Sequence, residues 1–281
     1  MPAELQAVPV PVTPAGRAGL AALVAAPRGA LIALDFDGTL APIVADPAAA
    51  RAHPGALPAL RALAPLIGTV AVITGRPAAD AVSFGGLDQV PGIIVLGHYG
   101  RQRWEDGSLT SPPPPPGLAL ARAQLAGVLA AAGAPGGTWT EEKGDAVAVH
   151  TRRAAQPQQA LEQLRAPLAE LAQRTGMVAE PGRLVIELRP PGSDKGQALR
   201  DLMQQRGATV SVFCGDDLGD RPAFAAVRGL RADGIAGLTV CSGSAEVTGL
   251  ADEADLVVPG PDGVVALLRS LAAALAGPAP A

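Results

Sequence analysis

Two aspartates stand at the end of the first long apolar run of the chain. Asp35 and Asp37 directly follow residues 31–34, within the string DFDGTL. A short run that is apolar throughout indicates a strand buried on both faces, and ligands of parallel sheets bind beyond the carboxyl ends of the strands. Two carboxylates there suit Mg²⁺, which binds carboxylates together with a substrate phosphate, and a carboxylate can itself attack phosphorus. The alternative is a solvated turn, because Asp and Gly are common turn residues.

A second group of carboxylates follows another apolar run near the end of the chain. Asp216, Asp217 and Asp220 come after residues 212–215, where a glycine lets the backbone turn. Such a cluster directly after a buried strand binds metal more often than it forms a solvated turn. The candidate ligands are all oxygen atoms, and the sequence has no His or Cys cluster, so the pattern favours Mg²⁺.

Groups that could hold a phosphoryl oxygen lie between the two acidic groups. Thr74 and Arg76 follow the predicted strand at residues 68–73, and Lys195 begins a predicted helix. A hydroxyl at a helix terminus can hold a phosphate, and an ammonium can neutralise its charge. Thr74 could instead cap the helix that follows it, and most lysines are solvated.

The order of the predicted elements indicates how these residues are positioned. Strands that alternate with helices favour βαβ units and a parallel sheet. After the proline run at 112–116, which favours a stiff spacer, the shorter strands indicate a small α+β module. We expect strands at 31–34, 68–73, 93–96, 146–150, 184–188, 209–214, 238–241 and 255–258, and helices at 18–26, 54–66, 118–132, 156–175, 195–206 and 264–274.

We therefore predict an α/β protein with a doubly wound parallel sheet core and an inserted α+β cap domain. The predicted core comprises residues 29–105 and 192–276, and the predicted cap comprises residues 106–191. Residues 1–28 are expected to form an N-terminal tail and a lead-in helix, which we favour over a signal peptide because no basic cluster opens the chain.

Charged residues lie in or beside the predicted strands of the insertion. Glu141 and Lys143 precede residues 146–150, Arg152 follows them, and Glu187 lies between two apolar residues. Carboxylates can accept hydrogen bonds from the hydroxyls of a neutral polyol, and Lys or Arg can donate to them. The alternative is an exposed sheet face with salt bridges.

Four motifs of the chain resemble those of the haloacid-dehalogenase (HAD) superfamily of phosphohydrolases. They are DFDGTL, ITGR, the KG pair at 195–196 and GDDLGD. The resemblance implies a HAD-like, Rossmann-like core and a Mg²⁺ cofactor. The implied metal ligands are Asp35, Asp37 through its backbone carbonyl, and Asp216, with Asp217 and Asp220 completing or supporting the site.

The same resemblance implies roles in catalysis. Asp35 is expected to attack phosphorus and form an aspartyl-phosphate, and Asp37 to protonate the leaving oxygen and then activate water. Thr74 and Lys195 are expected to offset the charge of the phosphate oxygens. Thr39 and Arg76 are expected to contact the substrate.

The insertion narrows the resemblance further. E-x-K, H-x-R and ELRP-x-G-x-x-KG are similar to motifs of the trehalose-6-phosphate phosphatase family. In that family a cap closes over the core and binds trehalose, which implies sugar contacts for Glu141, Lys143, Arg152 and Glu187. The chain departs from the family pattern at Thr151, where many relatives have Tyr, and at Gly219 and Arg221, where many have Thr and Glu.

Composition excludes several classes of partner. A net charge of -4 argues against general binding of nucleic acid or an acidic membrane, and no apolar run is long enough to span a bilayer. Cys214 and Cys241 lie in strand-like apolar runs and are interpreted as buried thiols, which fits a reducing compartment. We expect a cytoplasmic location and a small sugar phosphate as the partner, with a monomer as the default and the oligomeric state open.

The sequence therefore predicts a Mg²⁺-dependent phosphatase that releases trehalose from trehalose 6-phosphate, the last step of trehalose biosynthesis. One alternative is the same chemistry on sucrose phosphate or a mannosyl phosphoglycerate. The other is a non-catalytic sensor of the sugar phosphate, against which the intact Asp35, Asp37, Lys195 and Asp216 argue.

Overall fold

A computed structural model describes residues 8–44, 46–192, 194–243 and 249–277, so part of the predicted tail, residues 1–7, lies outside the described residues. The chain divides into two compact units, one formed by residues 1–111 and 194–281 and the other by residues 112–193. The first unit thus retains the hairpin that follows the third parallel strand, through which the predicted boundary at residue 106 would have cut.

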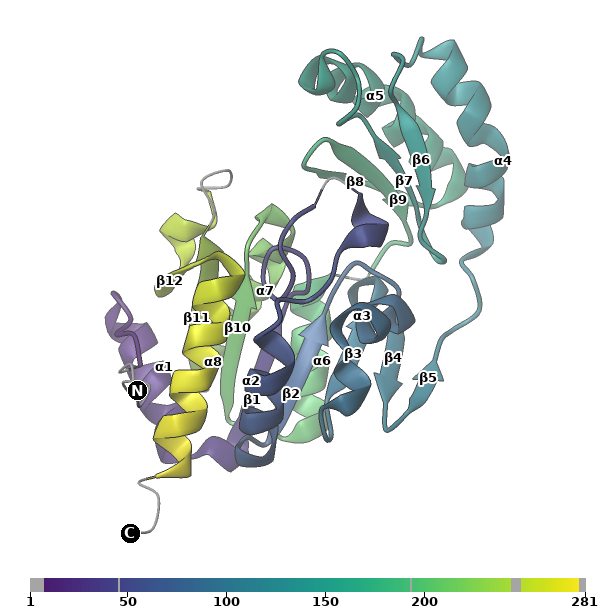
Figure 1. The fold of residues 1–281 in the computed structure, drawn as a ribbon. Helices are drawn as coiled ribbons and strands as arrows, with labels where there is room; N and C mark the ends of the chain where they lie inside the picture. The colour runs from purple at the N-terminus through teal and green to yellow at the C-terminus, as the bar shows by residue number, and fades with distance from the viewer. Residues whose placement is uncertain (1–7, 45, 193, 244–248, 278–281) are drawn as a thin grey trace. The chain divides into compact units, whose positions relative to one another are not determined.

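The first unit contains an eight-stranded sheet with strand order β12-β11-β10-β1-β2-β3-β4-β5 (Figure 1). All neighbours from β12 to β3 pair in parallel, and β4 and β5 extend the sheet as an antiparallel hairpin. The strands are β1 (Ala30–Leu34), β2 (Thr69–Ile73), β3 (Ile94–Gly97), β4 (Gln102–Glu105), β5 (Ser108–Thr110), β10 (Val210–Gly215), β11 (Ala236–Gly243) and β12 (Leu256–Pro259).

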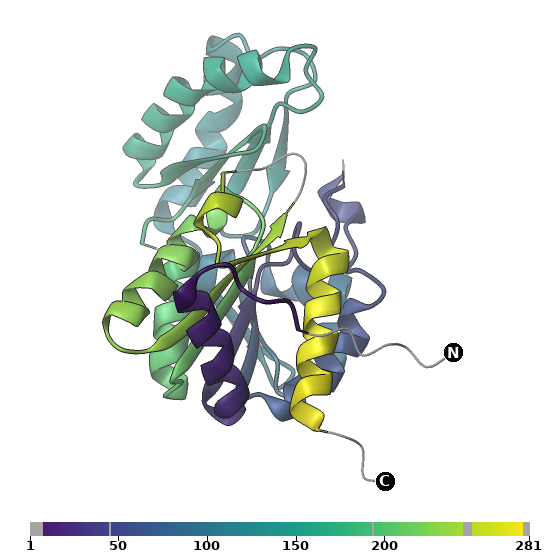
Figure 2. The ribbon, with the colours of Figure 1, turned by 90° about the vertical axis from the view of Figure 1, so that its left-hand side faces the viewer.

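Helices cover both faces of this sheet because its central strands are apolar on both faces. Along β1, Ile32 and Leu34 belong to one apolar cluster, and Leu31 and Ala33 belong to another. The first cluster includes side chains of α1 (Pro14–Ala25), α2 (Ala56–Leu63), α3 (Ala78–Gly85) and α8 (Gly260–Ala276), and the second includes side chains of α6 (Lys195–Arg206) and α7 (Arg221–Ala232). Figure 2 shows α7 and α8 on opposite sides of the strands.

The second unit is a four-stranded antiparallel sheet with helices packed on one face. Its strand order is β6-β7-β9-β8, and its helices are α4 (Pro116–Ala131) and α5 (Pro157–Thr175). Leu125 and Leu164 of these helices pack against Val149 and Leu188 of the sheet. The strands are β6 (Trp139–Glu142), β7 (Val147–His150), β8 (Val178–Gly182) and β9 (Val185–Arg189). An open antiparallel sheet with two helices is the α+β arrangement predicted for the insertion.

Candidate active site

The candidate site lies at the carboxyl edge of the parallel sheet. In the strand order, β10 and β2 are the two neighbours of β1, so the segments that follow these three strands emerge side by side. Asp35, Thr74 and Asp216 are the residues that come directly after the three strands. Lys195 is the first residue of α6, whose N-terminus is capped by the Asp194 side chain accepting from the Gln197 amide at 2.8 Å.

Lys195 is a buried cation between two buried carboxylates. Its Nζ lies 2.9 Å from Asp35 Oδ2 and 2.8 Å from Asp220 Oδ1. Burial raises the pKa of Asp35 well above its usual value, and the charge of Lys195 opposes that rise. Burial lowers the pKa of Lys195, but Asp220 and Asp35 outweigh it and hold that pKa well above its usual value. The ammonium is therefore a fixed positive charge at the predicted nucleophile.

Asp220 holds the loop after β10 in place. Its Oδ2 accepts from the backbone amides of Asp216 at 2.9 Å and Asp217 at 3.3 Å, while its Oδ1 accepts from Lys195. The Asp217 side chain accepts from the Gly219 amide at 2.8 Å and caps the short 3₁₀ turn Leu218–Asp220. Both oxygens of Asp220 and one of Asp217 thus have partners within the protein. Direct metal ligation by either residue stays a prediction.

Asp216 is the carboxylate best placed to receive a cation. It is 3% exposed, and its carboxylate makes no hydrogen bond or ion pair with the residues that the structure describes. Ligand oxygens of Asp35, Asp216 and Asp220 all lie within 4.8 Å of one another. Burial, followed by the charges of Asp35 and Asp220, raises the pKa of Asp216 to about 10. A hard divalent cation would remove this repulsion, so the residues present fit Mg²⁺.

A close backbone approach shapes the space around Asp216. Gly38 has φ +76°, and a Cβ there would lie 2.0 Å from Asp216 Oδ2. Its carbonyl accepts a 2.6 Å hydrogen bond from the buried hydroxyl of Ser242, at the carboxyl end of β11. Sequence reasoning missed Ser242, although its place at the end of a predicted strand could have indicated it.

Asp37 is more exposed than the buried carboxylates and is paired with Arg76. The guanidinium donates from Nε to Oδ2 and from Nη2 to Oδ1, both at 2.6 Å. The Asp37 side chain is 39% exposed and that of Arg76 only 12%. The predicted acid–base residue thus has both carboxylate oxygens in an arginine fork, and Arg76, the predicted substrate contact, is bound to it.

The two predicted threonines are buried on neighbouring loops. The Thr39 hydroxyl has no hydrogen-bond partner among the described residues. The Thr74 hydroxyl accepts from the Arg76 amide at 3.2 Å, whereas α3 begins only at Ala78 with Pro77 at its N-cap. Thr74 therefore does not cap the helix, which was the alternative interpretation of this residue.

A strained turn after β3 supports the Thr74 loop, and sequence reasoning missed it. His98 and Tyr99 have φ of 49° and 58°, values that favour glycine. Their amides donate to the carbonyls of Arg76 at 2.9 Å and Thr74 at 3.0 Å, respectively. Consecutive left-handed residues without glycine cost about 1–3 kcal/mol each and persist where the surrounding structure requires them.

Three of the predicted sugar contacts lie together on the helix-free face of the second unit. Glu141, Ala148 and Glu187 are directly opposite one another across β6, β7 and β9. Lys143 Nζ lies 2.8 Å from Glu187 Oε2 and 4.0 Å from Glu141 Oε2. Glu187 Oε1 is buried and accepts no hydrogen bond from a described residue. This row of acceptors and a donor is the chemistry that sugar hydroxyls require.

Arg152 and the stacked pair of Trp139 and His150 lie in or next to the same strands. Arg152 lies in the turn after β7, half-buried, with no hydrogen bond or ion pair to the described part of the chain. His150 Nε2 lies 2.7 Å from Glu141 Oε2, and its ring stacks on Trp139 with centroids 4.6 Å apart. His150 is therefore a neighbour of the predicted sugar contacts that sequence reasoning did not assign.

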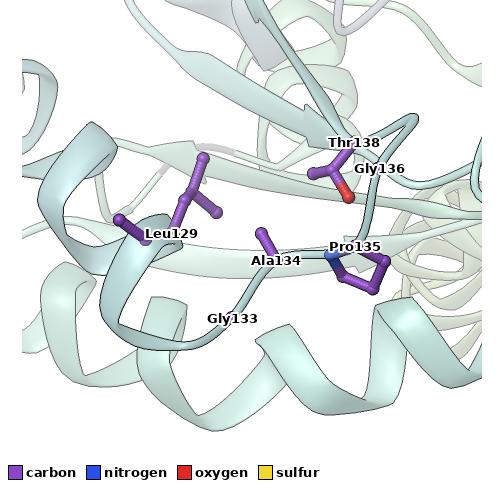
Figure 3. A pocket seen from close by; sticks show the side chains of 7 residues that line it. Leu129, Gly133, Ala134, Pro135, Gly136 and Thr138 are labelled. Atoms are coloured by element: carbon purple, nitrogen blue, oxygen red, sulfur yellow. The ribbon is translucent and has the colours of Figure 1, made fainter.

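A pocket elsewhere in the second unit is not a site for this chemistry. It lies between the end of α4 and the start of β6 (Figure 3). Its lining has no ionisable side chain and includes none of the predicted site residues. The lining residues are Leu129, Ala130, Gly133, Ala134, Pro135, Gly136 and Thr138.

No described helix combines the length and apolarity that are needed to span a bilayer.

Comparisons with known proteins identify the family of the chain. The model of the trehalose-phosphatase family matches residues 33–255. The chain is 37% identical over 216 residues to a trehalose-phosphate phosphatase of Mycobacterium avium, with 74% of this chain and 54% of that protein covered. It is 38% identical over 214 residues to an uncharacterized glycosyl hydrolase of Mycobacterium tuberculosis, of which it spans only 15%. The chain thus spans about half or less of these relatives.

Solved structures show the same fold. The C-terminal domain of Candida albicans trehalose-6-phosphate phosphatase superposes with a TM-score of 0.75 at 21% identity, covering 94% of this chain and 98% of that one. A haloacid dehalogenase-like hydrolase from Bacteroides thetaiotaomicron superposes with a TM-score of 0.58 at 15% identity, covering 85% and 98%. The predicted HAD-like fold and the predicted family are confirmed, and the chain belongs to the trehalose-phosphatase family.

Proposed function

We propose that the chain is a Mg²⁺-dependent phosphatase that hydrolyses trehalose 6-phosphate to trehalose and phosphate. The observation that carries the proposal is the buried cluster in which Lys195 contacts Asp35, while the carboxylate of Asp216 has no hydrogen bond or ion pair to a described residue. A structural role alone does not explain a buried carboxyl group that has no hydrogen-bond partner among the described residues. Family membership adds the expected reaction and substrate.

The cation has ligands in the residues present. Asp35 and Asp216 would hold it, together with the backbone carbonyl of Asp37 that the resemblance implies. When bound, Mg²⁺ would neutralise charge on the phosphate oxygens and so favour attack by an anionic nucleophile. Lys195 acts in the same direction, because its charge opposes the effect of burial and favours the ionised form of Asp35.

The reaction proceeds by two displacements at phosphorus. An oxygen of Asp35 forms a bond to phosphorus while the bond from phosphorus to the sugar oxygen breaks, and Asp37 gives a proton to that leaving oxygen. Asp37 then takes a proton from water, whose oxygen attacks the aspartyl-phosphate and releases phosphate and free Asp35. The buried hydroxyls of Thr39 and Thr74 can donate to the equatorial oxygens during both steps.

The second unit would supply the specificity. Glu141 and Glu187 can accept hydrogen bonds from sugar hydroxyls, and Lys143 and Arg152 can donate to them. Glu187 Oε1 supports this role, because a buried carboxylate oxygen needs a donor and this one has none among the described residues. The competing functions are hydrolysis of another sugar phosphate, such as sucrose phosphate or a mannosyl phosphoglycerate, and a purely sensory role. A cytoplasmic location stays an expectation.

A substrate panel tests the proposal. Phosphate release with Mg²⁺ is measured for trehalose 6-phosphate, sucrose phosphate and a mannosyl phosphoglycerate, with the Asp35→Asn protein as control. We expect the highest kcat/KM for trehalose 6-phosphate and no turnover by Asp35→Asn. A higher kcat/KM for another substrate would reassign the specificity. Tight binding of trehalose 6-phosphate without turnover would identify a sensor.

A further inference from the structure

The contacts of Arg76 point to a role that the family motif does not specify. We propose that Arg76 is a positioning residue that holds the carboxylate of Asp37 for proton transfer, and that it is not a ligand of the substrate. The inference rests on the proposed phosphatase function, in which Asp37 is the acid and base. It follows from where the guanidinium donates and from how the side chain is held.

The guanidinium is directed at Asp37. Nε and Nη2 donate to the two carboxylate oxygens, each at 2.6 Å, in the planar two-bond arrangement that arginine makes with a carboxylate. The remaining terminal nitrogen, Nη1, donates to the carbonyl of Pro47 at 2.9 Å. Each of the three guanidinium nitrogens therefore has a partner within the protein.

The arginine is held by its surroundings more firmly than the aspartate. Its guanidinium carbon lies 5.7 Å from the ring centroid of Phe36 and 5.4 Å from that of Phe84. Its own backbone is also fixed, since its amide donates to Thr74 and its carbonyl accepts from the left-handed His98. With a side chain only 12% exposed against 39% for Asp37, Arg76 is the fixed member of the pair.

Geometry then constrains how Asp37 can act. Proton transfer to a sugar oxygen requires one carboxylate oxygen to face that oxygen, whereas both are held by the fork in the substrate-free structure. One of the two hydrogen bonds must open during turnover while the other still orients the carboxylate. Arg76 would thus contribute only to the part of the rate that depends on the acid.

Substrates with different leaving groups separate this role from phosphate binding. Trehalose 6-phosphate has an alkoxide leaving group that needs a proton, whereas p-nitrophenyl phosphate has a stable phenolate leaving group that needs it much less. General acid catalysis contributes roughly 10²–10⁴-fold. We therefore expect Arg76→Leu to lower kcat for trehalose 6-phosphate at least about tenfold more than kcat for p-nitrophenyl phosphate, with the inhibition constant of inorganic phosphate within about threefold of wild type.

The chain offers a matched control in Arg51. This arginine stacks on the same Phe84 ring at 4.6 Å and donates to carbonyls of the same loop, at Ala48 and Ala50, but makes no contact with Asp37. Arg51→Leu should leave the ratio of the two kcat values unchanged. Arg76→Lys, which keeps the charge but cannot form the fork, covers the case in which Arg76→Leu does not fold and should also lower the ratio.

A double-mutant cycle with Asp37→Asn completes the test. If Arg76 acts through Asp37, Arg76→Leu should change the kcat ratio in the wild-type background but not in the Asp37→Asn background. Equal losses of kcat on both substrates, with a raised inhibition constant of phosphate, would overturn the inference. Full additivity in the cycle would overturn it as well. Either result would mark Arg76 as a phosphate ligand. A wild-type protein that hydrolyses neither substrate would instead overturn the proposed function and this inference with it.

Discussion

Replacing Lys195 by methionine tests the electrostatics of the candidate site without relying on catalysis. The substitution keeps an unbranched side chain of similar length and removes the charge. In the wild-type protein Lys195 Nζ contacts Asp35 Oδ2 at 2.9 Å and Asp220 Oδ1 at 2.8 Å, and all three side chains are nearly inaccessible to water. Removing the cation leaves two buried carboxylates facing Asp216 with no positive charge between them.

The expected loss in the free energy of unfolding follows from the burial of Asp35 and Asp220, which lose their partner. Breaking a buried ion pair by removing one member costs about 3–5 kcal/mol, a large part of the roughly 5–15 kcal/mol that stabilises a typical domain. Burial raises the pKa of Asp35, and Lys195 opposes that rise, so the pKa of Asp35 should increase further in Lys195→Met. A carboxyl whose pKa is raised in the folded state contributes stability that is present below its unfolded pKa and is lost as pH rises through its folded pKa.

Urea unfolding at pH 5 and pH 8, without divalent cations, measures the effect. We expect Lys195→Met to lose stability relative to wild type at both values and to lose more at pH 8, and we expect Mg²⁺ to restore part of the loss. Arg228→Met is the control, because Arg228 pairs with Glu253 at 3.1 Å on the surface of the same unit and is expected to cost only about 0–1 kcal/mol. A loss below about 1 kcal/mol, or one equal at the two pH values, would refute the reasoning.

Two further predictions concern the metal and the cap. Burial and then the charges of Asp35 and Asp220 raise the pKa of Asp216 to about 10 in the metal-free protein, so Mg²⁺ binding should release a proton and should weaken about tenfold for each pH unit between pH 8 and pH 6. Calorimetry in buffers of different ionisation enthalpy measures the proton release. Mg²⁺ binding without proton release would contradict this prediction. Glu187→Gln and Lys143→Met should each lower kcat/KM for trehalose 6-phosphate about ten- to a hundredfold, because each lost charged hydrogen bond is worth about 1.5–3 kcal/mol. Hydrolysis of p-nitrophenyl phosphate should change little. Equal losses on both substrates would assign the two residues a structural role.

The local pattern of the sequence was sufficient to predict the sheet edge at which the site lies. Residues 31–34 are apolar at every position, and residues 209–214 are apolar except for Thr209 and Ser211. Such runs are typical of strands buried on both faces, and the structure has parallel strands at Ala30–Leu34 and Val210–Gly215. Since parallel strands end at one edge, the aspartates that follow them had to emerge near one another. The fold class and this grouping therefore followed from the residue pattern, and the family followed from the resemblance of the motifs.

Elements without such a pattern were not predicted. β6 (Trp139–Glu142) contains two glutamates and β8 (Val178–Gly182) contains a proline and a glycine, residues that are uncommon in strands. Both form because they pair with a neighbour, β6 with β7 and β8 with β9. Strand formation there depends on the partner strand, about which the local sequence says nothing.

Tertiary structure alone decided which charges meet. The resemblance implies that Asp220 completes or supports the metal site, and the fold brings it to Lys195, 25 positions away. Arg76 meets Asp37 across 39 positions, and Lys143 meets Glu187 across 44. A carboxylate has the same chemistry whether it binds a cation, a lysine or a backbone amide. Its partner is determined by the packing of helices and strands that are distant in sequence, and that packing exists only in the folded chain.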